Sequence, residues 1–258
     1  MENSKKQTLS IKVDPFNTDF AKRWSWMSLG KTLLNAAELH AKNRGFGMYN
    51  VNSENCTWVL SRLCVEIFEM PVVWDTVNVC TWIENIYRLF TDRNFSIKGA
   101  DGKVYGYARS IWALIDYTTR EPQNLEQMYG DDFGGFLAPE EECPIRKQGR
   151  VKPLDNDCWV KDIKSEYSDI DLNGHVNSIK YIEHIMDLFP MSDYENGRNM
   201  SRIEIAYMSE SYYSDILSLY KKKIDDDVYE VEVRGRKDDL DCAPAQTNTF
   251  VRCNLIFK

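Results

Sequence analysis

The chain has 258 residues, enough to bury a sizeable core in one large domain or two smaller ones. Its formal net charge of −8 argues against general nucleic-acid binding, because phosphate recognition needs a basic surface. No apolar run approaches the roughly 20 residues of a membrane span. The chain opens with neither an apolar signal core nor an Arg- and Ser-rich transit segment. We therefore expect a cytoplasmic protein.

Cysteine and histidine usage argues against a metal or disulfide framework. The 7 cysteines are odd in number and show no CxxC spacing, which favours reduced thiols over disulfides or a zinc site. Only three histidines are present, His40, His175 and His184, and none has HxxxH spacing. We expect no metal and no redox cofactor.

The first half of the chain predicts a strand, a long helix and a series of antiparallel strands. Residues 7–27 alternate loosely between polar and apolar side chains, which suits a strand. Ser28 is placed to cap the helix that follows. Apolar residues recur on one face of that helix, at Leu29, Leu33, Ala36 and Ala37. Further strands are predicted at 56–68, 76–82, 93–97 and 105–117, with a hairpin turn at Asp101-Gly102.

Residues 121–155 break this pattern. They contain Pro122, Pro139, Pro144 and Pro153, a Gly134-Gly135 pair, and separate acidic and basic runs, a composition typical of a linker. The sequence therefore predicts an N-terminal unit over 1–125, a linker over 126–155 and a C-terminal unit over 156–258.

The second half repeats the first. A strand at 159–165 precedes a helix that reaches about residue 189, and strands follow at 202–207, 216–224, 228–236 and 249–257. Two copies of one strand–helix–strands unit indicate an internal duplication. We predict an α+β fold in which each unit wraps a curved antiparallel sheet around one helix. Two such units in tandem would build a pseudo-dimer within one chain.

The stretch 169–178, Asp-Ile-Asp-Leu-Asn-Gly-His-Val-Asn-Ser, concentrates polar groups directly before the second helix. Asp171, Asn173 and His175 are spaced by two, so in an extended segment they project from the same side. From Val176 the apolar residues recur at three and four, as in an amphipathic helix. A helix N-terminus favours developing negative charge. The stretch therefore has the properties of an oxyanion site beside a candidate base.

This motif, together with Lys180-Tyr181-Ile182, resembles the active-site segment of the acyl-ACP thioesterases of plant plastids and their bacterial relatives. Trp58–Arg62 and Ala108–Trp112 resemble the N-terminal half of that family, and Ile203–Ser211 resembles the C-terminal half. The order of these motifs extends the resemblance over most of the chain. It implies two tandem hot-dog units and a role in lipid metabolism, with hydrolysis of fatty acyl-ACP thioesters to free fatty acid and holo-ACP.

The resemblance also implies that Asp171, Asn173, His175 and Glu210 form one catalytic constellation. Two carboxylates compete for the role of general base. We expect Glu210 to activate water, Asn173 and His175 to position it and stabilise the oxyanion, and Asp171 to orient the network. The competing interpretations are a structural histidine at a helix start, a solvated glutamate on a strand, and Asp171 itself as base or nucleophile. The first half has no Asp-x-Asn-x-His equivalent, so we expect one active site.

The sequence departs from the plant members at one position. They carry a cysteine directly after the glutamate, whereas this chain has Ser211. A serine hydroxyl is a far weaker nucleophile than a thiolate unless a dedicated base contacts it. A cysteine cannot then be essential to thioester hydrolysis here, and Ser211 as nucleophile is the less favoured alternative.

The resemblance favours an acyl tunnel lined by Leu29, Leu33, Ala36 and Ala37 over a stripe that only faces the core. The expected partner is acyl carrier protein, which is acidic, and the basic clusters 146–152 and 221–223 are candidate docking sites. An acyl-CoA thioesterase and a non-catalytic acyl- or carrier-binding protein are the alternative functions. The sequence leaves a homodimer open.

Overall fold

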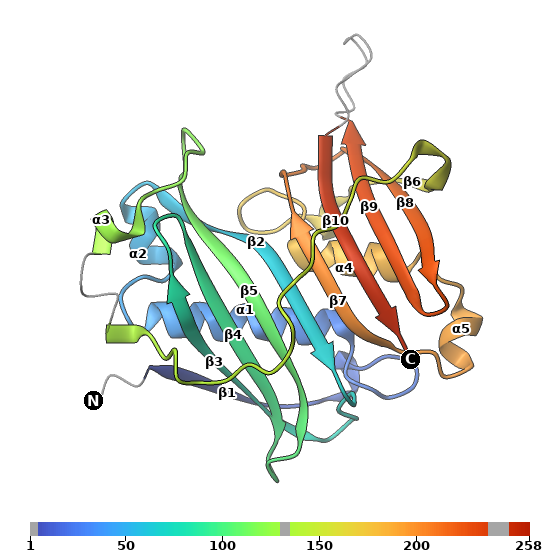
Figure 1. Cartoon of the computed structure of the whole chain (residues 1–258), viewed down its shortest axis with the longest axis horizontal. Coiled ribbons are helices and arrows are strands. Elements are labelled where there is room, and N and C mark those ends of the chain that lie inside the picture. Colours follow the sequence, from blue (N-terminus) through green and yellow to red (C-terminus); the bar gives the residue numbers. More distant parts are fainter. Residues whose placement is uncertain (1–4, 130–134, 237–247) are drawn as a thin grey trace. The chain divides into compact units, whose positions relative to one another are not determined.

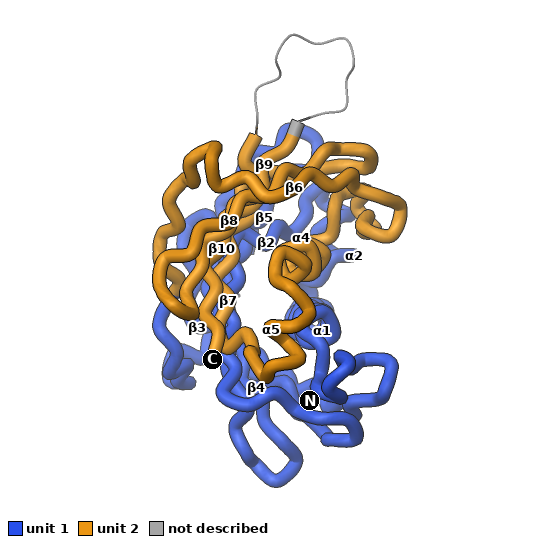
Figure 2. The backbone as a smooth tube through the Cα atoms, turned by 90° about the vertical axis from the view of Figure 1, so that its right-hand side faces the viewer, with its two compact units in different colours: residues 1–147 blue, residues 148–258 orange. Residues whose placement is uncertain are grey.

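The computed structural model describes residues 5–129, 135–236 and 248–258. The chain divides into two compact units, Met1–Lys147 (unit 1) and Gln148–Lys258 (unit 2), which Figure 2 shows in separate colours. The division falls inside the segment 126–155 whose composition predicts a linker. None of the helices in the described residues is long and apolar enough to cross a membrane.

Unit 1 is an antiparallel sheet with a long helix against one face (Figure 1). Hydrogen bonds between neighbouring strands give the order β1-β3-β4-β5-β2. The strands are β1 (Lys6–Lys12), β2 (Cys56–Ile67), β3 (Thr76–Ile86), β4 (Phe90–Gly99) and β5 (Val104–Asp116). The helices are α1 (Trp26–Lys42), α2 (Met48–Ser53) and α3 (Leu125–Tyr129), with a 3-10 turn at Pro15–Asn17.

Unit 2 has the same construction with a shorter central helix. Its strand order is β6-β8-β9-β10-β7, again antiparallel throughout. The strands are β6 (Trp159–Lys164), β7 (Met200–Tyr207), β8 (Ile216–Asp225), β9 (Val228–Arg236) and β10 (Asn248–Phe257). The helices are α4 (Ser178–Met186) and α5 (Met191–Glu195), with 3-10 turns at Asn156–Cys158 and Tyr167–Asp169. The central helix stops short of Phe189, since that residue precedes Pro190 and a residue before proline disfavours the helical conformation.

The two strand orders are identical once each unit is numbered from its own first strand: first, third, fourth, fifth, second. In each unit the long helix follows the first strand and lies on one face of the sheet (Figure 1). The predicted internal duplication and α+β architecture of tandem hot-dog units are therefore confirmed.

The segment 7–27 is not the single strand that its alternation predicts. β1 covers only its start, and the chain then turns because Asp14 and Asp19 accept backbone N–H groups within the loop. The helix is capped three residues earlier than predicted, by Ser25 in place of Ser28, and the Ser25 hydroxyl accepts the N–H of Ser28 at 3.2 Å. Short polar side chains that bond nearby backbone compete with strand pairing, and here they prevail.

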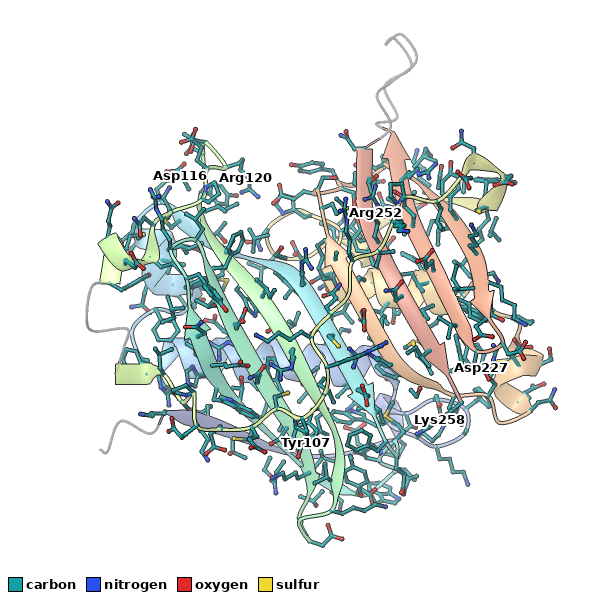
Figure 3. The ribbon with its side chains drawn as sticks, viewed as in Figure 1. Tyr107, Asp116, Arg120, Asp227, Arg252 and Lys258 are labelled. Atoms are coloured by element: carbon teal, nitrogen blue, oxygen red, sulfur yellow. The ribbon has the colours of Figure 1, made fainter. Side chains whose placement is uncertain are left out.

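Residues 138–154, called the strap below, cross the face of the sheet that α1 leaves uncovered in unit 1 (Figure 1). The Arg109 guanidinium on β5 donates to the Ile145 carbonyl at 3.0 Å and pairs with Glu84 at 2.7 Å. Tyr107, labelled in Figure 3, packs against an apolar cluster of unit 1. That cluster consists of the buried residues Cys64, Trp82, Ala138, Cys143 and Ile145. The predicted linker therefore adds to the core of unit 1.

In unit 2 the strap is held by two buried carboxylates. Glu204 accepts the Gly149 N–H at 2.9 Å, and Glu232 accepts the Leu154 N–H at 2.8 Å. Only 1% of Glu232 is exposed, although β9 places it on the face opposite the apolar core. Arginines compensate these charges. Arg202 forms an ion pair with Glu204 at an N···O distance of 2.7 Å. Arg234 and Arg252 (Figure 3 labels Arg252) form ion pairs with Glu232 at 2.8 and 3.0 Å.

We predict that Glu232→Ala lowers the free energy of unfolding by about 3 kcal/mol. The change leaves Arg234, Arg252 and the Leu154 N–H without their shared acceptor in a buried site. Urea denaturation measures the loss. The matched control is Glu230→Ala on the same strand, for which we expect a change within about 0.5 kcal/mol. Equal losses in both variants would contradict a structural role for the strap contacts.

The same carboxylates predict a pH dependence of stability. Burial acts to raise the pKa of Glu232, but hydrogen bonds from Arg234 and the Leu154 backbone outweigh it and hold that pKa below its ordinary value. The pKa of Glu204 is lowered in the same way, with the Gly149 N–H opposing burial. Such groups contribute stability above their unfolded pKa of about 4.3 and lose it as the pH falls through the folded pKa. We expect the melting temperature to drop below about pH 4.3, and to drop less steeply in Glu232→Gln. If the melting temperatures of the wild type and Glu232→Gln fell equally steeply with pH, Glu232 would not be the source of this pH dependence.

Candidate active site

The Asp171 carboxylate organises the loop that precedes α4. Its Oδ1 accepts the backbone N–H of Asn173 at 2.8 Å and that of His175 at 3.2 Å. Its own N–H donates to the His175 carbonyl at 2.8 Å, and its carbonyl accepts the N–H of Gly174 at 3.1 Å. Gly174 has φ +82°, a conformation that glycine adopts at little cost. One aspartate therefore fixes the backbone on which Asn173 and His175 stand.

The loop leads directly into the helix. The Asn177 side chain caps α4 by accepting the Ile179 N–H at 2.9 Å, and the Asn177 N–H donates to the Asp169 carbonyl at 2.8 Å. The Val176 N–H donates to the Ser211 carbonyl at 2.8 Å, which ties the loop to the segment after β7. The backbone donors around the predicted oxyanion site are thus largely occupied within unit 2. A bound carbonyl would depend on side-chain donors.

His175 and Glu210 meet across this tie. Nε2 of His175 lies 3.6 Å from Oε2 of Glu210, with 20% and 28% of the two side chains exposed. The Tyr212 ring stands edge-on to the imidazole, with centroids 5.1 Å apart, and its hydroxyl donates to Glu210 at 3.4 Å. A partly exposed carboxylate beside an imidazole can accept a proton from water or another ligand.

Asn173 completes the group from the loop. Its backbone N–H is bonded to Asp171, while its half-buried side-chain amide makes no hydrogen bond to the part of the chain that the structure describes. Asp171, Asn173, His175 and Glu210, identified from the sequence, therefore lie on two segments of unit 2 that hydrogen-bond to each other. Sequence reasoning missed Tyr212, because nothing in the spacing links it to either partner.

Unit 1 contains the same loop without the candidate catalytic side chains. Oδ1 of Asp19 accepts the N–H of Ala21 at 2.9 Å and that of Arg23 at 3.0 Å, as Asp171 does in unit 2. Ala21 and Arg23 therefore occupy the positions of the motif's asparagine and histidine. Asp19 also pairs with Arg23 through their side chains at 2.9 Å. The aspartate therefore makes the same loop bonds in a unit that lacks the asparagine and the histidine.

The segment that carries Glu210 also has a counterpart in unit 1. Asp75 and Asp215 each accept the N–H of the residue three positions earlier, at 3.0 and 2.8 Å. Counting back from these aspartates places Met70 where unit 2 has Glu210. The two units therefore share a scaffold, and the amide, imidazole and glutamate occur together only in unit 2.

Ser211 is buried with 1% of its surface exposed, and its hydroxyl lies 2.5 Å from that of Tyr181 on α4. Its carbonyl accepts the Val176 N–H. Burial raises the pKa of Tyr181 well above its ordinary value, although the Ser211 contact opposes that rise. A serine held this way links the segment after β7 to the helix α4.

A cavity in unit 1 lies between α1 and the inner face of the sheet. It encloses about 420 Å³ of space not occupied by protein atoms, part of it open to solvent. Of the four helix residues predicted to line an acyl tunnel, Ala37 lines this cavity. Leu29, Leu33 and Ala36 are fully buried and are not among its lining residues. Among the described residues, no three His, Cys, Asp or Glu side chains are grouped to hold a metal ion.

Known proteins resemble both units. Residues 4–132 match the family model of the acyl-ACP thioesterase N-terminal domain, and residues 153–250 match that of the C-terminal domain. An oleoyl-acyl carrier protein thioesterase of Arabidopsis thaliana is 25% identical over 192 residues, covering 69% of this chain and 52% of that protein. The chain spans about half the length of the curated relatives it matches.

Solved structures extend this similarity to the whole chain. An acyl-ACP thioesterase from Bacteroides thetaiotaomicron is 42% identical to this chain and has a TM-score of 0.88. The match covers 100% of this chain and 100% of that one. A 12:0-ACP thioesterase from Umbellularia californica has a TM-score of 0.83 over 99% of this chain and 98% of its own, and its 18% identity supports the shared fold alone. With both family domains matched in order along the chain, this protein belongs to the acyl-ACP thioesterase family.

Proposed function

We propose that this protein hydrolyses fatty acyl-ACP thioesters to free fatty acid and holo-ACP. The observation that carries the proposal is the approach of the Glu210 carboxylate to His175 at 3.6 Å, with Asn173 two residues before His175 in the same loop. The chemistry needs a base for water, a donor for the thioester carbonyl and no covalent enzyme intermediate.

In the proposed reaction Glu210 takes a proton from water while the oxygen bonds to the thioester carbonyl carbon. Negative charge then develops on the carbonyl oxygen. Because backbone N–H groups from Asn173 to Asn177 are bonded within the unit, the Asn173 amide and the His175 ring are the proposed donors to this oxygen. Collapse breaks the C–S bond, and the proton held by Glu210 passes to the departing sulfur of ACP.

Asp171 is the competing candidate for the base. One of its oxygens accepts two backbone N–H groups, and Asp19 makes the same pair of bonds in a loop that lacks the asparagine and histidine. Both facts favour a positioning role. We therefore assign Asp171 to holding Asn173 and His175 in place, and Glu210 to proton transfer.

The carrier is proposed from family membership. The names of the similar proteins refer to acyl carrier protein, and the exposed residues Arg150 and Lys152 are candidates for contact with its acidic surface. Within the second basic cluster, Lys221 donates to the Leu188 carbonyl and Lys223 pairs with Asp226 at 3.1 Å. Those two lysines are already engaged, so we favour the strap cluster.

The proposal is tested by free fatty acid release from acyl-ACP and acyl-CoA substrates of matched chain length. We expect turnover of acyl-ACP to exceed that of acyl-CoA. Turnover of acyl-CoA alone would select the acyl-CoA thioesterase alternative. Acyl-chain binding without release from either series would select the non-catalytic alternative.

Variants of the site separate the roles. We expect His175→Ala and Glu210→Gln each to lower kcat by about 10²–10³, because each removes a positioned catalytic group. Asp171→Asn should lower kcat by a smaller factor, because it acts only by making the loop that carries Asn173 and His175 less ordered. Asp19→Asn is the matched control: it alters the equivalent loop bond in unit 1 and should cost similar stability with kcat unchanged. A Glu210→Gln enzyme with most of its activity, beside an inactive Asp171→Asn, would move the base to Asp171.

Ser211→Ala gives a separate prediction. If the serine only links strand to helix, the variant keeps kcat within about twofold and loses about 1 kcal/mol of stability with its bond to Tyr181. Tyr181→Phe should cost a similar amount, and the double variant should cost less than the sum, because the two changes remove one interaction. A loss of activity on the scale of His175→Ala would instead support Ser211 as nucleophile.

A further inference from the structure

The cavity of unit 1 is lined mostly by apolar side chains and also by two charged ones. Its wall includes the rings of Phe46, Trp58 and Trp112 and the side chain of Ile83. The rings and aliphatic groups suit a hydrocarbon chain. Arg93 and Glu38 also line it, on opposite sides of the layer, one on β4 and the other on α1. A cavity for a hydrocarbon alone gains nothing from these charges.

Arg93 is a guanidinium on the inner face of the sheet. Its exposure is 5%, and its strand neighbours on that face, Thr91 and Phe95, are equally buried. Its hydrogen bond within the described part of the chain goes from Nη1 to the Thr81 hydroxyl at 3.3 Å. A guanidinium carries several N–H donors, so most of them are left for a group in the cavity.

Its charge persists in this position. Burial and the nearby Arg44 lower the pKa of Arg93 to about 9, with Glu38 acting in the opposite direction, so the group is protonated at neutral pH. Burying a charge is costly unless partners are supplied. The remaining donors of Arg93 are therefore available to water or to a ligand group in the cavity that Arg93 lines.

Glu38 supplies the complementary chemistry. Its two carboxylate oxygens accept the Met48 N–H at 3.0 and 3.2 Å, which fixes the carboxylate at the cavity. Among the ion pairs of the described residues, Glu38 and Arg93 do not pair with each other. A ligand group beside them meets a donor and an acceptor. A hydroxyl satisfies both, whereas a carboxylate would be repelled by Glu38 and a methyl group would leave Arg93 dehydrated and unpaired.

We propose that the cavity of unit 1 recognises an acyl chain that carries a hydroxyl group far from its thioester, with Arg93 donating to the hydroxyl oxygen and the hydroxyl donating to Glu38. The identification of the ligand as an acyl chain rests on the proposed function. The specificity for a hydroxyl rests on the two charged groups in an otherwise apolar cavity.

The test measures binding of free fatty acids by calorimetry, without any turnover. The probes are ω-hydroxy acids from octanoic to hexadecanoic length, each beside its unsubstituted acid, with 3-hydroxy acids as a positional control. At one or more lengths the ω-hydroxy acid should bind about tenfold or more tightly than its unsubstituted partner. The 3-hydroxy acids should show no such gain. Equal binding at every length would overturn the proposal.

Variants assign the effect to the cavity. Arg93→Met should remove the preference for the ω-hydroxy acid and leave binding of unsubstituted acids unchanged or improved. Arg88→Met, which makes the same change at an exposed arginine in the turn after β3, should keep the preference. A preference that survives Arg93→Met would overturn the proposal. If Arg93→Met does not fold, Glu38→Gln and the wild-type comparison still decide the outcome.

Failure of this inference is distinguishable from failure of the proposed function. Release of fatty acid from acyl-ACP, combined with equal binding of hydroxylated and plain acids, would refute the hydroxyl specificity alone. Preferential binding of ω-hydroxy acids without hydrolysis of any acyl-ACP would refute the hydrolase and leave the cavity's specificity standing.

Discussion

A carboxylate that accepts two backbone N–H groups determines the shape of the loop before the central helix in both units. Asp171 and Asp19 make these bonds at 2.8–3.2 Å, and each loop ends in a polar cap, Asn177 or Ser25. The loop must bend sharply while its amides stay paired, and a single aspartate meets both requirements. The position of His175 in unit 2 depends on this arrangement.

The duplication separates scaffold from chemistry. The aspartate is common to both units, whereas Asn173, His175 and Glu210 are replaced in unit 1 by alanine, arginine and methionine. A fold supports a reaction only where the right side chains are placed on it. The comparison of the two units therefore distinguishes a positioning residue from candidate catalytic residues without reference to any other protein. In unit 1 a cavity that Arg93 lines lies between the central helix and the sheet.

The strap shows how charge can act as a structural element. Its unit 2 part is held by Glu204 and Glu232, and its unit 1 part by Arg109. Each ion brings its own counter-ion, which offsets much of the desolvation that burial costs. The outer faces of both sheets are thus covered by a segment that contains three prolines and forms neither helix nor strand.

The duplicated α+β architecture and most strand positions could be predicted from the sequence, because hydrophobic periodicity is a local property. The four residues of the candidate site were implied by the resemblance of short motifs to a known family. The sequence did not determine where the first helix begins, since Asp14, Asp19 and Ser25 compete with strand pairing in ways that alternation does not reveal. The burial of Glu232 and the position of Arg93 at a cavity became evident only in the folded structure. Both outcomes depend on segments far away in the chain. A charged residue on a strand is expected to be exposed, and only the fold shows that another segment covers it.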